Sequence, residues 1–179
     1  GYLHIINVTD KRNPTILSNI SVYKARAVVA DDMYNYAFVG THNKSNPEVS
    51  GELHVIDITN KSNPKYLAKI THQTLTDVQA MYIEGDYLYT SAWHRDDLTI
   101  INIANKSNPY IQTIFKHPRL YGSMDLRVDN NIVYMTSEYA NSIVIVDVNN
   151  KTNPQLIGHF CNTTSLYYPY ELEVIGDEI

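Results

Sequence analysis

The sequence predicts an all-β protein that is built from repeats of about 45 residues. A strand-and-turn motif recurs, and the prolines that end its four copies lie 50, 45 and 45 residues apart. No stretch shows the apolar period of about 3.6 residues that marks a helix. A period of roughly 40–50 residues that contains only strands and turns is typical of propellers and solenoid arrays. The four copies occupy residues 3–14, 53–64, 98–109 and 143–154.

Each motif begins with a strand that is apolar on both faces, as in Leu-His-Val-Ile-Asp at 53–57 and Ile-Val-Ile-Val-Asp at 143–147. Such a strand is covered on both sides. A β-propeller provides this cover, because each blade lies between two neighbouring blades. The Asx residues and the proline that follow end the strand, since Asx side chains bond the backbone two residues ahead and proline cannot donate to a sheet.

The rest of each repeat supplies three further strands. After the proline comes a more polar strand, which is typical of the outer edge of a blade. A loop and a hairpin follow, most clearly at 80–91, where Gly85-Asp86 tolerate the positive φ of a tight turn. The counterparts of this hairpin are 126–137, which turns at Asn130-Asn131, and 28–40. Four antiparallel strands per repeat make a propeller blade.

These units predict a partial β-propeller over residues 1–179. We expect three complete blades at 25–71, 77–116 and 123–160. An outer strand pair at 3–22 is expected before them, and the inner strand of a further blade at 169–179 after them. The last hairpin, at Gly176-Asp177, lacks its second strand, which favours a segment of a larger ring over a closed four-bladed one.

The motif resembles the LVIVD repeat, which is named for strands such as the one at 143–147. Tyr-Leu-Tyr at 87–89 and Tyr-Ala-Phe-Val at 36–39 are similar to the hairpin of that family. The resemblance covers essentially the whole chain and implies a β-propeller of a bacterial or archaeal surface or secreted protein. It implies no catalytic residue, because the family has no general catalytic motif. Asn7 and Asn102 depart from the pattern, since they replace the motif's Asp.

Composition excludes several classes of function. The net charge of −5 and the scattered Lys and Arg argue against nucleic-acid binding, which needs clustered basic residues. No apolar run approaches the roughly 18 residues that a membrane helix needs, so no direct membrane insertion is expected in this segment. Cys161 is the single cysteine, so the chain has neither a disulfide framework nor a CxxC metal motif.

The predicted functional face is the one on which two kinds of loop emerge. One kind leads into the inner strand of the next blade, and the other follows the hairpin. Both kinds are rich in His, Tyr and Trp, and Tyr and Trp are favoured at binding surfaces. We therefore expect a recognition face for a ligand or partner there. Its candidate residues are His72, Trp93, His94, His117, Tyr121, Tyr139 and Tyr168.

Catalytic and metal-binding alternatives remain open. Imidazoles suit Zn, Cu and Fe, so His72, His94 and His117 could hold a metal, although no pair has the tight spacing of a zinc motif. Asp125 and Glu171 lie on inner strands and could act as paired acid–base carboxylates or simply line a solvated channel. Calcium would need acidic pairs such as 31–32 and 96–97, which lack the spacing of a loop site and are better explained as turn residues.

Seven Asn-x-Ser/Thr triplets occur, where about two or three are expected by chance. Three of the triplets are copies of one turn that recurs in the repeats. They are not independent, so the excess over chance is weaker evidence for glycosylation than the number seven suggests. Exposed turns are accessible to a glycosylating enzyme. The candidate glycosylation sites are Asn60, Asn105 and Asn150, with Asn43 and Asn162 in addition.

The sequence therefore favours a non-enzymatic module at the cell surface or outside the cell, with no cofactor. Its expected partners are other proteins or glycans, with self-assembly as a further option. An enzyme with a metal or carboxylate site on the loop face is the first alternative. A structural spacer of a surface filament or layer is the second.

Overall fold

The computed structural model describes residues 1–31, 33–42, 49–176 and 178–179. Two short 3₁₀ turns, η1 (Gln73–Leu75) and η2 (Pro118–Leu120), accompany the strands in these ranges. The strands are β1 (Tyr2–Asn7), β2 (Thr15–Ser21), β3 (Ala25–Ala30), β4 (Tyr36–Thr41), β5 (Gly51–Asp57), β6 (Lys65–His72), β7 (Val78–Glu84), β8 (Tyr87–Ala92), β9 (Asp97–Asn102), β10 (Tyr110–Lys116), β11 (Ser123–Asp129), β12 (Ile132–Ser137), β13 (Ser142–Asp147) and β14 (Gln155–Cys161).

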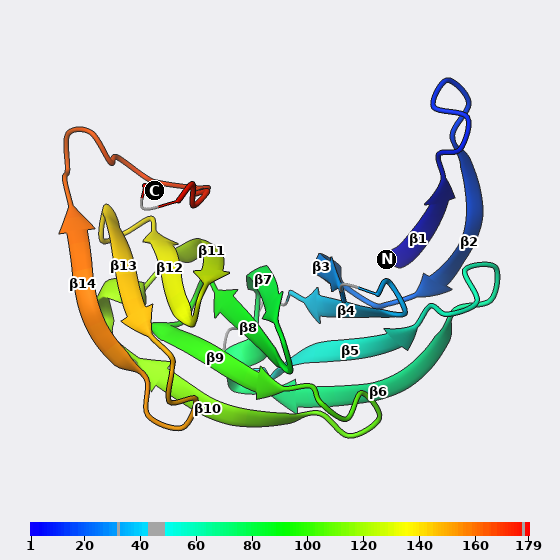
Figure 1. The fold of residues 1–179 in the computed structure, drawn as a ribbon, viewed down its shortest axis with the longest axis horizontal. Helices are drawn as coiled ribbons and strands as arrows, with labels where there is room; N and C mark the ends of the chain where they lie inside the picture. Colours follow the sequence, from blue (N-terminus) through cyan, green and yellow to red (C-terminus); the bar gives the residue numbers. More distant parts are fainter. Residues whose placement is uncertain (32, 43–48, 177) are drawn as a thin grey trace.

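The strands form three four-stranded antiparallel sheets and one two-stranded sheet, which confirms the all-β prediction. The orders are β3-β4-β5-β6, β7-β8-β9-β10 and β11-β12-β13-β14, and β1 pairs with β2. The inner strands β3, β7 and β11 lie next to one another. The sheets follow an open arc, with the β1–β2 hairpin at one end and β14 at the other (Figure 1). Each four-stranded sheet is one propeller blade.

The apolar core consists of separate layers between adjacent sheets. The layer between the first two blades contains Val55 and Ile101, and the layer between the second and third contains Ile100 and Val146. The layer beneath β1–β2 contains Ile56, the sequence neighbour of Val55, so β5 is buried on both faces as its sequence predicts. The described chain therefore has no single central core.

The motif's turn is built by its Asx residues. Asn60, Asn105 and Asn150 each accept a hydrogen bond on Oδ1 from the backbone N–H two residues ahead, at 3.0–3.1 Å. Asp10 accepts the equivalent bond from Arg12 at 3.0 Å. Because Asp performs the same task as Asn in the first copy, the turn requires an Asx side chain rather than a glycan acceptor.

The lysine of the motif ties the turn back to the blade. Lys61, Lys106 and Lys151 each donate from Nζ to the carbonyl three residues earlier, at 2.6–2.8 Å. Lys151 Nζ also lies 5.4 and 5.7 Å from the ring centroids of Tyr87 and Tyr89, which belong to the preceding blade. Burial lowers the pKa of Lys151. The lysine thus caps the strand end and, in the third blade, contacts the neighbouring sheet.

The C-terminal segment 169–179 differs from the predicted inner strand. Its described residues form no strand, and only Ile175 and Glu178 make an isolated bridge. Leu172 N–H instead donates to Asp125 Oδ2 at 3.1 Å, and Tyr170 C=O accepts from Thr136 Oγ1 at 3.4 Å. Side chains of the third blade thus satisfy part of the backbone of this segment.

Asp97, the first residue of β9, is a buried carboxyl group that is only 1% exposed. Its Oδ1 accepts a long hydrogen bond of 3.4 Å from Thr99 Oγ1, and its Oδ2 has no hydrogen-bond partner among the described residues. Burial raises the pKa of Asp97 from 3.8 to about 6. The folded protein therefore binds more protons than the unfolded chain between these two values, and its stability falls as the pH rises through this range.

We predict that Asp97→Asn stabilises the protein at pH 7–8 by up to about 3 kcal/mol and removes the loss of stability between pH 4 and 6. The measurement is urea unfolding across this pH range. The matched control is Asp86→Asn on the exposed hairpin turn, which should leave the pH profile unchanged. A wild-type profile in which stability rises from pH 4 to 6, and which Asp97→Asn does not alter, would contradict the assignment.

Candidate functional site

Two sets of loops emerge on one face of the arc, which we call the loop face. Inter-blade loops precede β3, β7 and β11, and each ends on a residue with positive φ: Lys24 at 57°, Asp77 at 58° and Gly122 at 78°. Return loops join the second and third strands of each blade. The backbone N–H groups of His42, Trp93 and Glu138 in the return loops donate to the carbonyls of Lys24, Asp77 and Gly122, at 3.0–3.2 Å. The same backbone frame therefore recurs in each blade and presents different side chains.

His72 and His117 shape the inter-blade loops. The Nδ1 atoms of these residues accept hydrogen bonds from the backbone N–H groups of Thr74 and Arg119, both at 3.2 Å, and so cap η1 and η2. Asn162 begins the next inter-blade loop in the same way, because its Oδ1 accepts from Thr164 and Ser165 at 2.9 Å. These polar residues position the loop backbone, a structural role that needs no ligand.

The aromatic candidates gather between the second and third blades. The rings of Tyr121 and Tyr139 stack with centroids 5.3 Å apart, and Trp93 lies parallel to Tyr139 at 6.3 Å. Partial desolvation, followed by nearby Glu138, Tyr121 and Tyr170, raises the pKa of Tyr139. A hydrogen bond with Tyr167 raises the pKa of Tyr168, and nearby Glu138 and Tyr139 add to the rise. We call Trp93, Tyr121, Tyr139, Tyr168 and Tyr170 the aromatic cluster.

Two contacts hold the aromatic cluster in place. Trp93 Nε1–H donates to Glu138 Oε2 at 3.0 Å and so links the second blade to the third. Tyr139 lies directly over Gly122, where an added Cβ would stand 2.4 Å from Tyr139 Cδ2. Glycine is therefore required at position 122 for two reasons, the positive φ and the close approach of the Tyr139 ring.

The equivalent place between the first two blades is polar. His94 corresponds to Tyr139 in its repeat, and its Nε2 lies 3.8 Å from Oδ2 of Asp77, which corresponds to Gly122. Asp77 is fully buried, and its Oδ1 lies 3.5 Å from Arg26 Nε. The Trp93 and His94 rings stand 4.7 Å apart, so this polar pair adjoins the aromatic cluster.

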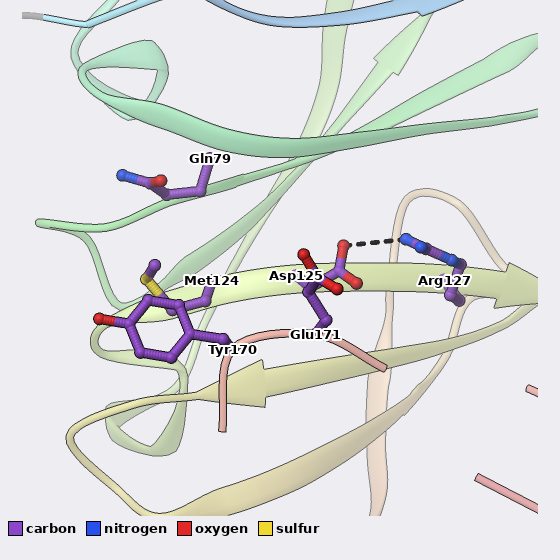
Figure 2. Close-up of a pocket in the computed structure, with 6 residues that line it drawn as sticks. All are labelled: Gln79, Met124, Asp125, Arg127, Tyr170 and Glu171. Atoms are coloured by element: carbon purple, nitrogen blue, oxygen red, sulfur yellow. Dashed lines mark hydrogen bonds and ion pairs between the residues drawn. The ribbon is translucent and has the colours of Figure 1, made fainter. Parts of the chain in front are cut away.

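A pocket of about 340 Å³ opens beside the aromatic cluster at the inner strands. Figure 2 shows Glu171 beside Asp125, with Tyr170 over Met124. Asp125 accepts from Arg127 Nη1 on Oδ1 at 2.9 Å and from Leu172 N–H on Oδ2 at 3.1 Å, so both of its oxygens are engaged. The lining residues are Gln79, Met124, Asp125, Arg127, Tyr170 and Glu171.

The hollow continues along the inner strands past Arg127. Arg127 Nε donates to Glu173 Oε2 at 3.2 Å, and a second space of about 320 Å³ is lined by Arg127, Glu173, Asp129 and Tyr82 among others. Asp125 and Glu173 therefore both pair with Arg127. Each carboxylate oxygen of Asp125 thus has a structural hydrogen-bond partner.

The described parts of the chain contain no group of three His, Cys, Asp or Glu side chains that could hold a metal ion. Asp31 has a local role, since its Oδ1 accepts from the N–H groups of Asn35 and Tyr36 at 2.8 and 2.9 Å and forms the hairpin turn. Asp97 is buried as described above. Asp32 and the glycosylation candidate Asn43 lie outside the described residues.

Three features of this face are not predicted from the sequence. They are Asp77 and Gly122 at the end of the inter-blade loops, Glu138 beneath Trp93, and Gln79 in the pocket. One signal was available: Lys24, Asp77 and Gly122 occupy one position when the repeats are aligned, and a glycine there is unusual in this glycine-poor chain. The contacts of Glu138 and Gln79 join different blades, and a single repeat does not reveal them.

The fold defines a segment of a β-propeller with its candidate site on the loop face. The family model of the LVIVD repeat matches residues 18–70, 76–116 and 122–163. These matches cover most of the chain, and the protein belongs to the LVIVD-repeat family. The resemblance predicted from the motif is thereby confirmed.

Solved structures share the fold at low sequence identity. The periplasmic gluconolactonase of Pseudomonas aeruginosa aligns with a TM-score of 0.70 and 12% identity, over 86% of this chain and 47% of that one. A chain of a nidogen/laminin complex aligns with a TM-score of 0.57 and 12% identity, over 84% and 52%. A protein of unknown function from Desulfotomaculum acetoxidans aligns with a TM-score of 0.57 and 10% identity, over 90% and 63%.

The chain thus spans between about half and two thirds of the length of these structures. Curated protein sequences give no significant match. Among the described residues, no helix has the length and apolar character needed to cross a membrane.

We predict that Gly122→Val displaces Tyr139, because the added Cβ would overlap its ring and φ at 122 disfavours a branched side chain. Trp93 is the one tryptophan of the sequence, so the fluorescence emission of the protein reports on the displaced stack. The expected result is a shifted emission maximum and a loss of about 2–3 kcal/mol in unfolding free energy.

The matched control for this prediction is Gly85→Val. Gly85 also has positive φ, at 57°, but an added Cβ would meet nothing within 4 Å. Gly85→Val should lose only the unfolding free energy that a branched residue at positive φ costs, and its Trp93 emission should be unchanged. Equal emission spectra for Gly122→Val and the wild type would show that Tyr139 does not depend on the glycine.

Proposed function

We propose that this chain is a non-enzymatic recognition module that acts outside the cytoplasm and contacts proteins or glycans through its loop face. The aromatic cluster is the observation on which the proposal rests. Tyr121 and Tyr139 remain 47% exposed and Tyr170 57% exposed, although they lie in a fixed arrangement. Ordered, half-exposed aromatic rings provide contact area at little cost in conformational entropy.

Three of the side chains considered for catalysis, His72, His117 and Asp125, have structural partners. His72 and His117 cap the 3₁₀ turns through Nδ1. Asp125 is hydrogen-bonded to Arg127 and to the C-terminal segment. These engagements favour recognition over acid–base chemistry, although a gluconolactonase has the same fold.

The comparisons agree with a location outside the cytoplasm. The LVIVD repeat is the family of the chain, and one structural relative is a periplasmic enzyme. Another is part of a nidogen/laminin complex, which is an assembly of proteins. A surface module that binds a partner through its loops is consistent with both relatives.

The proposal predicts that a Tyr121→Ser/Tyr139→Ser variant loses at least about ten-fold in affinity for the cell envelope or extracellular matrix of the organism of origin. The measurement is saturation binding of the labelled, purified chain. The matched control is Tyr110→Ser/Phe160→Ser, which removes aromatic side chains of similar exposure, 52% and 54%, from the outer strands β10 and β14.

Equal loss in both variants, or in neither, would contradict a recognition role for the loop face. Saturable binding that only the control variant loses would indicate contact through the outer strands, as in a structural spacer. Turnover of a bound substrate that stops in Asp125→Asn would favour the enzyme alternative.

We further propose glycosylation at Asn60, Asn105 and Asn150, which lie exposed on turns at the face opposite the loops. Their Oδ1 atoms accept the hydrogen bonds of the turns, and modification of Nδ2 would leave those bonds in place.

Peptide mass spectrometry of protein secreted from a glycosylating host should show sugar on these residues and none on Asn149, which has no sequon. Unmodified peptides from such a host would refute this proposal. Asn162 is half-buried and caps a loop, so it is a weaker candidate.

A further inference from the structure

We infer that the ligand of the aromatic cluster is a neutral, hydroxyl-rich glycan, with a sugar ring lying on the tyrosines and its hydroxyl groups reaching into the adjoining pocket. This inference rests on the proposed function, since it specifies the ligand class of the same face. It uses two features side by side, the aromatic surface and the polar pocket, which meet at Tyr170.

The aromatic surface suits the flat, weakly polar C–H face of a pyranose. Tyr121 and Tyr139 are stacked on one another, and Trp93 lies at 10° to the plane of Tyr139. Tyr121 and Tyr139 are each about half exposed, so part of each side chain is accessible for contact. The quadrupole of an aromatic ring attracts C–H groups that carry a partial positive charge.

The pocket supplies hydrogen-bonding groups for hydroxyls. Gln79 Oε1 accepts from Arg26 Nε at 3.1 Å, which fixes the amide, and its buried Nε2 has no hydrogen-bond partner among the described residues. Because this Nε2 is buried, a ligand hydroxyl in the pocket would bond to the exposed groups of the lining instead. Glu171 beside Asp125 supplies exposed acceptor oxygens to the pocket lining (Figure 2).

The charges of the site favour a neutral ligand over an ionic one. Arg127 pairs with both Asp125 and Glu173, at 2.9 and 3.2 Å. Glu138 accepts one hydrogen bond, from Trp93 Nε1. A basic peptide would find Asp125 and Glu173 already paired with Arg127, and an acidic glycan would be repelled by Glu138 and Glu171.

The site is also arranged before any ligand binds. The Trp93–Glu138 hydrogen bond and the seating of Tyr139 on Gly122 hold the rings, and Asp125 holds the segment that contains Tyr170. Binding of a sugar to such a surface therefore costs little conformational entropy of the protein.

The test is a titration of the wild-type chain that follows Trp93 fluorescence. The probes are neutral glucan, mannan and chitin hexasaccharides, hexagalacturonic acid as the acidic sugar, and hexalysine as the basic peptide. We expect saturable quenching by at least one neutral hexasaccharide and none by the two charged probes. Tyr139→Ala should weaken this binding by at least about ten-fold, and Tyr110→Ala, its exposed counterpart on β10, should leave it unchanged.

Failure of this inference is distinguishable from failure of the proposed function. If periodate treatment of the envelope abolishes binding and protease treatment does not, the glycan assignment is supported. If protease abolishes binding, periodate does not, and no neutral hexasaccharide quenches Trp93, the loop face recognises a protein and the glycan inference is overturned. If the wild-type chain does not bind the envelope at all, the proposed function falls as well.

Discussion

Burial of both faces of each sheet is the constraint on which the rest of the structure depends. Val55 and Ile56 are adjacent on β5 and enter different apolar layers, one toward the second blade and one toward β1–β2. A four-stranded sheet of this kind cannot bury itself and is stable only between neighbours. The backbone frame of the loop face lies within each blade, because the bonds from His42, Trp93 and Glu138 to Lys24, Asp77 and Gly122 continue the pairing of its first two strands. The scaffold is therefore uniform, while the side chains on its loops are free to differ.

The difference between two equivalent junctions shows how such a scaffold acquires a site. Asp77 and His94 occupy one junction, and Gly122 and Tyr139 occupy the next, on the same backbone frame. Removal of the side chain at 122 admits the tyrosine ring, which then stacks with Tyr121 and lies parallel to Trp93. The aromatic cluster thus arises from a few changes in loop residues, and the apolar layers beneath it remain alike.

Sequence reasoning predicts the blades well because the determinants of strands and turns are local. The alternation in the motif, its Asx side chains and its proline act over a few residues each. The candidate site is harder to predict from the sequence. His72 and His117 are predicted to face a ligand, whereas in the structure each caps a 3₁₀ turn. Glu138, Gln79 and Asp125 acquire their roles from other blades or from the C-terminal segment. The strand predicted at 169–179 is absent from the described residues, whose backbone groups bond instead to side chains of the third blade that the local sequence does not identify.

The central claim is that the chain binds its partner through the aromatic cluster. The most direct measurement is covalent footprinting of tyrosine side chains in the free chain and in the chain bound to envelope or matrix material. The account predicts protection of Tyr121, Tyr139, Tyr168 and Tyr170, with Tyr66 and Tyr110 on the outer strands equally reactive in both states. Protection confined to the outer strands, with the loop-face tyrosines unchanged, would contradict it.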